Sequence, residues 1–517
     1  MKTTHILFIA AAGCILAACG QKTQPVFPDE KEAVLYSRTM IDARMSAWYN
    51  KDAQVGFPNA NSTNGIVQPE AAATWDYVPG VVAKGILDVW SLYRDSAWAD
   101  AWYEGLAAWA ESDACVAHAA QMMKGGILDD LNCAKVYLGL YEGAKPGGKY
   151  ENAERAAFYM EQMRLAAKGL EEHKALYSIK CEVPSDQVPS TKEDSYEPEI
   201  NGGWMHKATG DPTQSYWGQM WCDGAYMGPA LLAQLIAAGA TEGLNLGWED
   251  VVKQFTASWP YLWDKEKRLL YHVLFTDVTV NKNGKAIYEA GHLYEVQRDD
   301  GQCTKVYHSE EFWGRADGWY IMAIVDVLEA MDKAQYRGAG YDTLRGYLTE
   351  LADGLVARQD KETGCWYQLL QYGTDKCATQ GVDETGSPKY TNVAEGGTQC
   401  NYLESSGSCL ITAALLKGTR LGYLNHADAG KRGFEGIVKQ FVNHHSINSS
   451  LGGTAASLNI TSSCQSAGLS KDRLGNAAYY LIGKDVPIQD NTEGKVLGAF
   501  LMAAAEYERL CTNSVNL

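Results

Sequence analysis

One arrangement recurs along this chain: an acidic residue beside small or aromatic residues, followed by an apolar stretch of helical length. The apolar stretches need burial on every side, whereas the stretches between them are amphipathic and keep one wet face. The acids that open the six repeats are Asp76, Asp129, Asp223, Asp317, Glu404 and Glu493. This alternation predicts an all-α fold, an (α/α)6 barrel of six helical hairpins in a single large domain. A linear solenoid is the alternative, but the chain has no obvious polar capping repeats.

The same periodicity gives the expected helices of the two rings. The amphipathic helices cover residues 33–48, 97–110, 151–170, 248–261, 341–357 and 429–442. The apolar helices cover residues 81–90, 134–141, 227–236, 320–331, 408–416 and 496–507. In such a barrel the inner helices run parallel, so their N-termini meet at one end. Their converging macrodipoles favour a bound anion there.

The N-terminus predicts export. A short apolar run follows Lys2, is too short to span a membrane as a helix, and ends in Leu16-Ala17-Ala18-Cys19. This ending resembles the bacterial lipoprotein cleavage box, in which Cys19 becomes the lipidated first residue; an ordinary secretory signal is the alternative. We therefore expect a cell-envelope lipoprotein, periplasmic or attached to the outer membrane of a Gram-negative bacterium. The expected division is a signal peptide at 1–18, a tether at 19–30 and the barrel at 31–512.

Composition excludes some classes of partner. The formal charge is −18 and no basic stripe is visible, so nucleic-acid binding is not expected. An acidic sugar stays open as a substrate, because it needs only a few local cations. No metal or cofactor is expected either: Cys-x-x-Cys and His-Glu-x-x-His motifs are absent, and the neighbours His444-His445 suit a structural role. The 15 Trp and 30 Tyr residues suit a carbohydrate site, although most rings are expected in the core.

The cysteines predict at least one unpaired thiol. Their number is 13, and an odd number remains once the signal peptide and Cys19 are set aside. Buried thiols are one expectation for the remainder. The other is disulfide formation in an oxidising compartment, for which the candidate pairs are Cys365–Cys377 and Cys400–Cys409.

Asp223 is the first candidate for chemistry. It stands between Trp221 and Tyr226, two rings that could form a sugar-stacking wall. Pro229 is tolerated only in the first turn of a helix, so we expect a helix from near Met227 and Asp223 on the turn before it. A carboxyl group against aromatic rings is suited to general-acid chemistry. The plain alternative is an N-terminal helix cap.

Five segments in order carry a resemblance to a known family. They are 202–207 (GGWMHK), 219–228 (QMWCDGAYMG), 312–320 (FWGRADGWY), 402–408 (YLESSGS) and 498–501 (GAFL). Together they resemble the unsaturated rhamnogalacturonyl hydrolases of glycoside hydrolase family 105, and more distantly the unsaturated glucuronyl hydrolases of family 88. The resemblance covers nearly all of the mature chain and implies the same (α/α)6 barrel.

The resemblance also implies an unusual reaction. Polysaccharide lyases leave a C4=C5 double bond at the non-reducing end of their products. The family hydrates this enol ether, and the resulting hemiketal at C5 rearranges and releases the neighbouring sugar. One carboxyl group can protonate C4 and then activate the water that attacks C5. The paired acid and nucleophile of ordinary glycosidases are therefore not required.

By position in the motifs, Asp223 matches the family's proton donor and Asp129 its second essential acid, with the adjacent Asp130 as the alternative. Arg315 would bind the uronate carboxylate with its fork, or serve as a structural bridge to Asp317 or another acid. Glu404 and Glu493 are expected as helix caps rather than catalysts. The remaining expected substrate contacts are Tyr77, His206, Lys207, Trp221, Met227, His272, Trp313 and Trp319.

The chain departs from the family beside these residues. Val273-Leu274-Phe275 replaces the usual Gly-Trp-Asp after His272, an insertion follows at 276–304, and Ala316-Asp317 stands where Gly-Asn is usual. These changes border the substrate cup and bear on which sugar is bound. The alternatives are therefore an unsaturated glucuronyl hydrolase acting on another acidic polysaccharide, an ordinary inverting glycosidase or a sugar epimerase on the same barrel, and a non-catalytic sugar-binding lipoprotein.

Overall fold

The computed structural model describes residues 36–45, 75–180, 199–208, 216–276, 306–381, 393, 396–446, 456–469, 473, 475–490 and 492–515. The predicted signal peptide, Cys19 and the tether lie outside these residues, as does most of the predicted insertion at 276–304. Across the described ranges, no helix combines the length and the apolar character that crossing a membrane requires.

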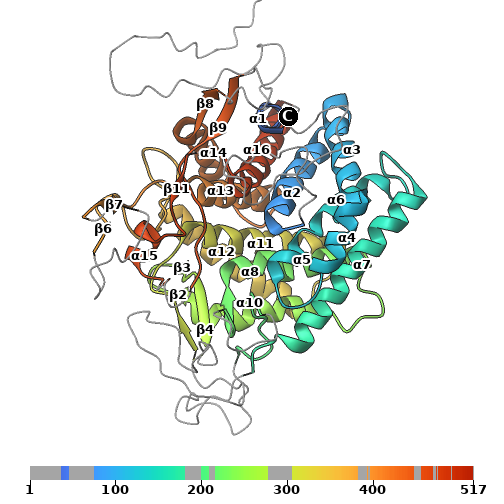
Figure 1. Cartoon of the computed structure of the whole chain (residues 1–517), viewed down its shortest axis with the longest axis horizontal. Coiled ribbons are helices and arrows are strands. Elements are labelled where there is room, and N and C mark those ends of the chain that lie inside the picture. Colours follow the sequence, from blue (N-terminus) through green and yellow to red (C-terminus); the bar gives the residue numbers. More distant parts are fainter. Residues whose placement is uncertain are drawn as a thin grey trace, which may run out of the picture.

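Outer and inner helices alternate along the chain (Figure 1). The outer ones are α1 (Tyr36–Met45), α3 (Ala97–Glu111), α7 (Ala153–Leu176), α10 (Trp248–Leu262), α12 (Ala339–Ala357) and α14 (Ala427–Phe441). The inner ones are α2 (Tyr77–Leu92), α5 (Leu128–Asn132) with α6 (Lys135–Ala144), α8 (Cys222–Met227) with α9 (Pro229–Ala237), α11 (Gly314–Lys333), α13 (Ser405–Arg420) and α16 (Gly494–Val515). Two further helices, α4 (Asp113–Met122) and α15 (Ala477–Ile482), were not expected from the sequence.

The inner helices close into a ring. Each packs against the next in chain order, and the last, α16, packs against the first, α2. Figure 1 shows this closure where the red and blue helices lie side by side. Glycines permit the approach: a Cβ atom on Gly498 would lie 2.5 Å from the carbonyl oxygen of Val81, and one on Gly85 would lie 2.8 Å from that of Gly498. The predicted (α/α)6 barrel is confirmed.

The prediction for the helix after Asp223 needs a correction. Helix α8 already begins at Cys222, so Asp223 lies in its first turn and not on a turn before the helix. The helix then breaks at Gly228, and Pro229 starts α9 as its first residue. Tyr226 forms no sugar-stacking wall, because it is fully buried beside Trp319 in the barrel core, where most of the rings were expected.

Helix α11 begins at Gly314, six residues before the predicted start at Tyr320. The reason is local: Arg315 and Asp317 interrupt the apolar pattern although both side chains are buried. The Arg315 guanidinium and one carboxylate oxygen of Asp317 find partners inside the protein, which periodicity alone does not reveal.

Short antiparallel strands connect the helices. A three-stranded sheet joins β1 (Gln219–Trp221), β4 (Val273–Thr276) and β5 (Val306–His308). The two-stranded pairs are β2 (Trp263–Asp264) with β3 (Leu269–Leu270), β6 (Cys377–Thr379) with β7 (Thr398–Cys400), β8 (Val442–Ser446) with β9 (Ala456–Ile460), and β10 (Ser463–Cys464) with β11 (Ile488–Gln489). Strand β1 leads directly into α8, and thereby fixes where Asp223 points.

Both candidate disulfides are wrong. Cys377 pairs with Cys400, its direct neighbour across β6 and β7. Cys365 and Cys409 are buried thiols. The spacing along the sequence could not indicate this, because the pairing depends on the register of two short strands.

Candidate active site

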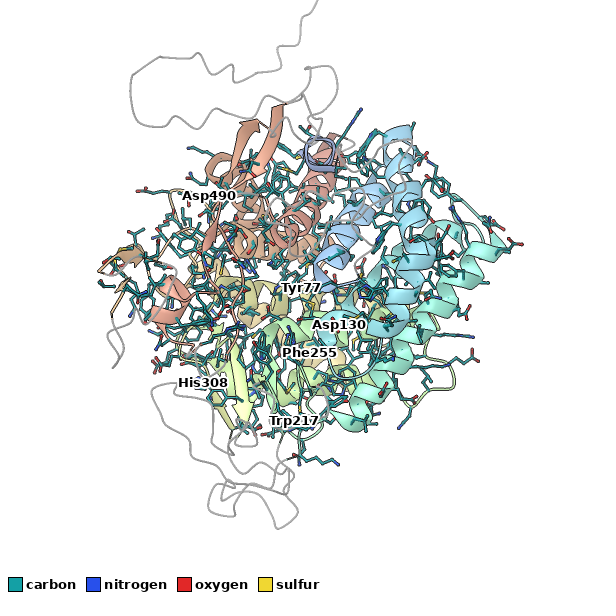
Figure 2. The ribbon with its side chains drawn as sticks, viewed as in Figure 1. Tyr77, Asp130, Trp217, Phe255, His308 and Asp490 are labelled. Carbon is teal, nitrogen blue, oxygen red and sulfur yellow. A yellow bond between two sulfur atoms is a disulfide. The ribbon has the colours of Figure 1, made fainter. Side chains whose placement is uncertain are left out.

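One cavity opens where the inner helices begin, with about 580 Å³ of space that no protein atom fills, part of it open to solvent. It gathers ten of the eleven residues that the sequence singled out for catalysis or binding: Tyr77, Asp129, His206, Lys207, Trp221, Asp223, Met227, Trp313, Arg315 and Trp319. Figure 2 shows Tyr77 near the middle of the molecule, at the start of α2. The eleventh residue, His272, lies behind Asp223.

His272 and Asp223 form the first pair. The Nε2 atom of His272 lies 3.2 Å from Oδ2 of Asp223, although neither atom makes an aligned hydrogen bond to any described group. Burial lowers the pKa of the His272 imidazole, even though Asp223 acts in the opposite direction. Its Nδ1 atom lies 2.7 Å from the hydroxyl of Tyr480. If Tyr480 donates, the ring proton sits on Nε2 and faces Asp223.

Backbone pairing brings the two residues together. Trp221 and Val273 are register partners between β1 and β4, and the amide of Cys222 donates to the carbonyl of His272 at 3.0 Å. The first turn of α8 is therefore tied to the residue before β4. This holds Asp223 over the imidazole.

Asp129 is held very differently. Its carboxylate lies 2.7 Å from Nζ of Lys207 and 3.3 Å from Nε2 of His206. Burial alone would raise the pKa of Asp129, but the two basic groups outweigh it and hold that pKa well below its usual range. The amide of Leu128 donates to the carbonyl of His206 at 3.1 Å, so the start of α5 and the His206-Lys207 segment are fixed to each other. Asp129 is thus an ionised, immobilised carboxylate.

The neighbouring Asp130 is not among the residues that line this cavity. Its pKa is raised to about 7 by burial, with the charges of Asp129 and Asp76 adding to the effect. In Figure 2 it is labelled on α5, close to Tyr77. Of the two adjacent acids, the structure therefore places Asp129 where a substrate can reach it.

Arg315 lines the floor, but most of its donors are engaged. Its Nε donates to Ser406 Oγ at 2.7 Å, and its two Nη groups donate to the carbonyls of Gln465 and Cys464. The acid that faces it is Glu404, at 3.8 Å. Asp317, the other candidate bridge partner, instead accepts from the amide of Leu270 at 3.0 Å. Few N–H groups of Arg315 therefore remain for a uronate carboxylate.

The two glutamates that open α13 and α16 are helix caps, as expected. Glu404 accepts from the amides of Ser406 and Gly407 at 3.1 and 2.6 Å. Glu493 accepts from the amides of Lys495 and Val496 at 3.1 and 3.0 Å. Neither carboxylate is among the groups that line the cavity.

Aromatic rings shape the rest of the cavity. Trp221 stacks on the His206 ring at 4.4 Å and 18°, and meets the His272 ring edge-on at 5.6 Å. The segment after β10 lies directly on it, because a Cβ atom on Gly468 would come within 2.6 Å of the Trp221 ring. Trp313 packs 4.7 Å from His272.

Sequence reasoning missed five lining residues: Tyr216, Ser466, Ala467, Arg473 and Lys495. The position of Lys495 could have been found, because it lies two residues after one of the repeated acidic openings. Tyr216 and Arg473 carry no local signal. They reach the cavity only because the segments before β1 and after β10 fold over the same ring.

Comparison with known proteins gives a family match over most of the chain. The family model described as Glycosyl Hydrolase Family 88 matches residues 195–387 and 380–511. Among curated proteins, Protein Atu3128 of Agrobacterium fabrum and the 24.9 kDa protein in picA locus of Rhizobium radiobacter are each 28% identical over 146 residues, or 27% of this chain. The chain spans about half the length of these curated relatives, 51% in each case.

Solved structures share the fold. A family 105 glycoside hydrolase from C. acetobutylicum is 23% identical with a TM-score of 0.57, and the match covers 92% of this chain and 99% of the other. A possible family 105 member from Klebsiella pneumoniae is 17% identical with a TM-score of 0.54, and the match covers 95% and 100%. At these identities the likeness concerns the barrel itself.

Proposed function

The chain belongs to glycosyl hydrolase family 88, and we propose that it is an unsaturated uronyl hydrolase. Its substrates are the oligosaccharides that polysaccharide lyases leave, and it releases the 4,5-unsaturated uronic acid from their non-reducing ends. The division of labour between the two carboxylates on the cavity is the observation that supports this proposal.

Two carboxylates, Asp223 and Asp129, are found among the described lining residues. Asp129 is ionised and locked by Lys207 and His206, so it is a poor proton donor and, with its low pKa, a weak base. An ordinary inverting glycosidase needs a working acid and a working base on opposite sides of the sugar. Hydration of an enol ether needs one group that does both in turn, and we assign both tasks to Asp223.

In the proposed reaction, the Asp223 carboxyl group gives its proton to C4 of the unsaturated ring. The positive charge that develops at C5 is shared with the ring oxygen. The Asp223 carboxylate then takes a proton from a water molecule as the water oxygen bonds to C5, which regenerates the acid. The hemiketal at C5 opens, and the neighbouring sugar leaves from C1. His272 and the ionised Asp129 hold the donor and the ring in place.

The charge lining the cavity supports an acidic sugar. Lys207, Arg315 and Lys495 all reach it, although the chain as a whole carries −18. We propose pectin-type rhamnogalacturonan fragments as the substrate, on the basis of the family 105 motifs. Unsaturated glucuronyl oligosaccharides are the alternative that the same experiment separates.

The test uses the protein without residues 1–19 and two lyase-generated disaccharides, one unsaturated rhamnogalacturonan and one unsaturated glucuronyl. The ultraviolet absorbance of the conjugated C4=C5 bond is followed with the unaltered protein and with Asp223→Asn. We expect the absorbance to fall only with the unaltered protein, and the faster disaccharide names the sugar. Unchanged absorbance with both sugars would exclude this function.

For location we propose a lipid anchor on Cys19, based on the sequence alone. Radiolabelled palmitate supplied to cells should be incorporated into the chain and not into a Cys19→Ala variant. Equal labelling of both, or of neither, would contradict the anchor.

A further inference from the structure

Exposure changes steadily from the floor of the cavity to its mouth. The floor is closed by Met227, Trp313 and Trp319, each 1% exposed. At the mouth the side chains of Lys207 and Arg473 are 33% and 26% exposed. Under the proposed function the terminal uronic acid enters first, so the second sugar, which the reaction releases, must rest near the mouth.

Arg473 is held at this mouth by two side chains. Its Nε lies 2.5 Å from a carboxylate oxygen of Asp485, and its Nη1 donates to the hydroxyl of Tyr216 at 2.6 Å. Asp485 is itself tied to the cavity wall, because its carbonyl oxygen accepts from both the amide and the hydroxyl of Ser466 at 3.0 and 2.9 Å. Within the described part of the chain, no bond to the Nη2 group of Arg473 is found.

Tyr216 completes the pair. Its ring meets Trp221 edge-on at 5.4 Å, so it stands on the same wall as the catalytic groups. Because its oxygen accepts from Arg473, its own hydroxyl proton is available to a ligand. The two side chains therefore present N–H and O–H donors side by side, held by an ion pair and a packed ring.

Arg473 thus differs from Arg315. The guanidinium of Arg315 on the floor donates to Ser406 and to the wall at 463–465. The guanidinium of Arg473 at the mouth keeps N–H donors for a ligand. Asp485 balances its positive charge at 2.5 Å, so the pair offers hydrogen bonds with little net charge. Such a site suits the hydroxyl oxygens of a neutral sugar better than a second anion.

We propose that Arg473 and Tyr216 bind the sugar that is released, through its hydroxyl groups, and so select substrates whose second sugar is neutral. The inference rests on the proposed function. It adds two residues that the sequence motifs do not contain, and it assigns them to the leaving sugar and not to the unsaturated ring.

The test compares two substrates on the mature chain. One is the unsaturated uronic acid linked to a neutral sugar, and the other is its methyl glycoside, which lacks a second ring. We expect Arg473→Met to lower kcat/KM for the disaccharide by about tenfold or more, as the loss of hydrogen bonds from a charged donor implies, and to leave the methyl glycoside within about threefold. Tyr216→Phe removes only one oxygen atom. It should also lower kcat/KM for the disaccharide and not for the methyl glycoside, but by a smaller factor.

Arg337→Met is the matched control. Arg337 lies 2.7 Å from Asp332 and packs over the Tyr341 ring, but it follows the C-terminal end of α11, away from the cavity. Its removal should leave both substrates unaffected. The melting temperature of each variant separates a loss of binding from a loss of structure. Because Arg473→Met leaves the Asp485 carboxylate without its cation, the double variant Arg473→Met with Asp485→Asn is measured as well.

Three results would overturn the proposal. The first is an equal fall in kcat/KM of Arg473→Met for both substrates, and the second is no fall in kcat/KM for the disaccharide. The third is a preference of the unaltered chain for a disaccharide whose second sugar is acidic. Failure of the function itself looks different, because the unaltered chain would then leave the absorbance of both substrates unchanged.

Discussion

Asp129 shows how basic neighbours can set the charge of a buried acid. Without Lys207 at 2.7 Å and His206 at 3.3 Å, burial would favour the protonated form of this carboxyl group. The low pKa that results means that Asp129 stays ionised across the pH range in which carboxylates usually titrate. We take this charge to be part of the site, since an ionised group can orient the sugar and stabilise positive charge near the ring.

The first prediction concerns Lys207→Met. Removing the ammonium group lets burial raise the pKa of Asp129, so Asp129 becomes protonated as the pH falls through a higher value than in the unaltered protein. The acidic limb of the kcat/KM profile should therefore move to higher pH. Lys207→Arg keeps the positive charge, so the acidic limb of its kcat/KM profile should stay at the same pH as in the unaltered protein. An unshifted limb in Lys207→Met would show that ionisation of Asp129 does not matter to the reaction.

The same contact links pH to stability. The pKa of Asp129 is depressed in the folded chain, so its contribution to stability is full above the unfolded value of about 3.9 and is lost as the pH falls through the folded value. In Lys207→Met this contribution is removed, and the difference in melting temperature between the two proteins should shrink at acidic pH.

Among the elements of the barrel, α11 is joined by Arg315 to α13 and to the wall at 463–465. The bonds of this side chain reach Ser406 in α13 and the carbonyls of Gln465 and Cys464. Arg315 therefore stabilises the fold, whether or not it also contacts a sugar. The same bonds explain why a charged side chain is 2% exposed inside an apolar barrel.

We therefore predict that Arg315→Met lowers the free energy of unfolding by about 3–5 kcal/mol, because it leaves Glu404 buried without its cation. Chemical denaturation measures this. The loss of unfolding free energy in the double variant Arg315→Met with Glu404→Gln should be smaller than the sum of the losses in the two single variants. A stable Arg315→Met protein with poor activity would instead mean that Arg315 serves the substrate alone.

The strand pair β6 and β7 is joined by a disulfide bond whose contribution to stability can be measured. The Cys377–Cys400 bridge closes a segment with a sequence separation of 23, for which loop entropy predicts about 3 kcal/mol of stabilisation. Cys377→Ser with Cys400→Ser should melt earlier than the unaltered protein. Dithiothreitol should lower the melting temperature of the unaltered protein only, and an equal effect on both would place the bridge elsewhere.

The whole molecule depends on closing the inner ring. A Cβ atom on Gly498 would lie 2.5 Å from the carbonyl oxygen of Val81. To relieve this clash the backbone of α2 would have to move away from that of α16. Gly498→Ala should therefore destabilise the barrel, despite the gain in helix propensity. Gly346 in α12, where a Cβ atom would meet nothing within 4 Å, is the control: Gly346→Ala should stabilise by roughly 0.5–1 kcal/mol. Thermal unfolding of both variants decides, and a stabilised Gly498→Ala protein would contradict tight closure.

Local patterns in the sequence are sufficient to predict the barrel, whereas most residues of its cavity were predicted from the resemblance to family 105. Helical periodicity and the repeated acidic openings are local signals, and they predicted the hairpins, their order and the two capping glutamates. Because inner helices of such a barrel run parallel, residues at their starts had to meet at one end. That is why Asp129 and Asp223, which open two of these helices, were expected at the same end, whereas Arg315 was assigned to the cavity through the resemblance to family 105.

How those residues are used depends on the tertiary structure. Tyr216 and Arg473 reach the mouth through segments with no helical pattern, so no spacing along the chain could bring them together. The partners of Arg315 lie about 90 and 150 residues away in the sequence, and the Cys377–Cys400 bridge depends on strand register. Patterns in a sequence encode which face of an element is buried, whereas the pairing of buried polar groups is set by what the fold brings within about 3 Å.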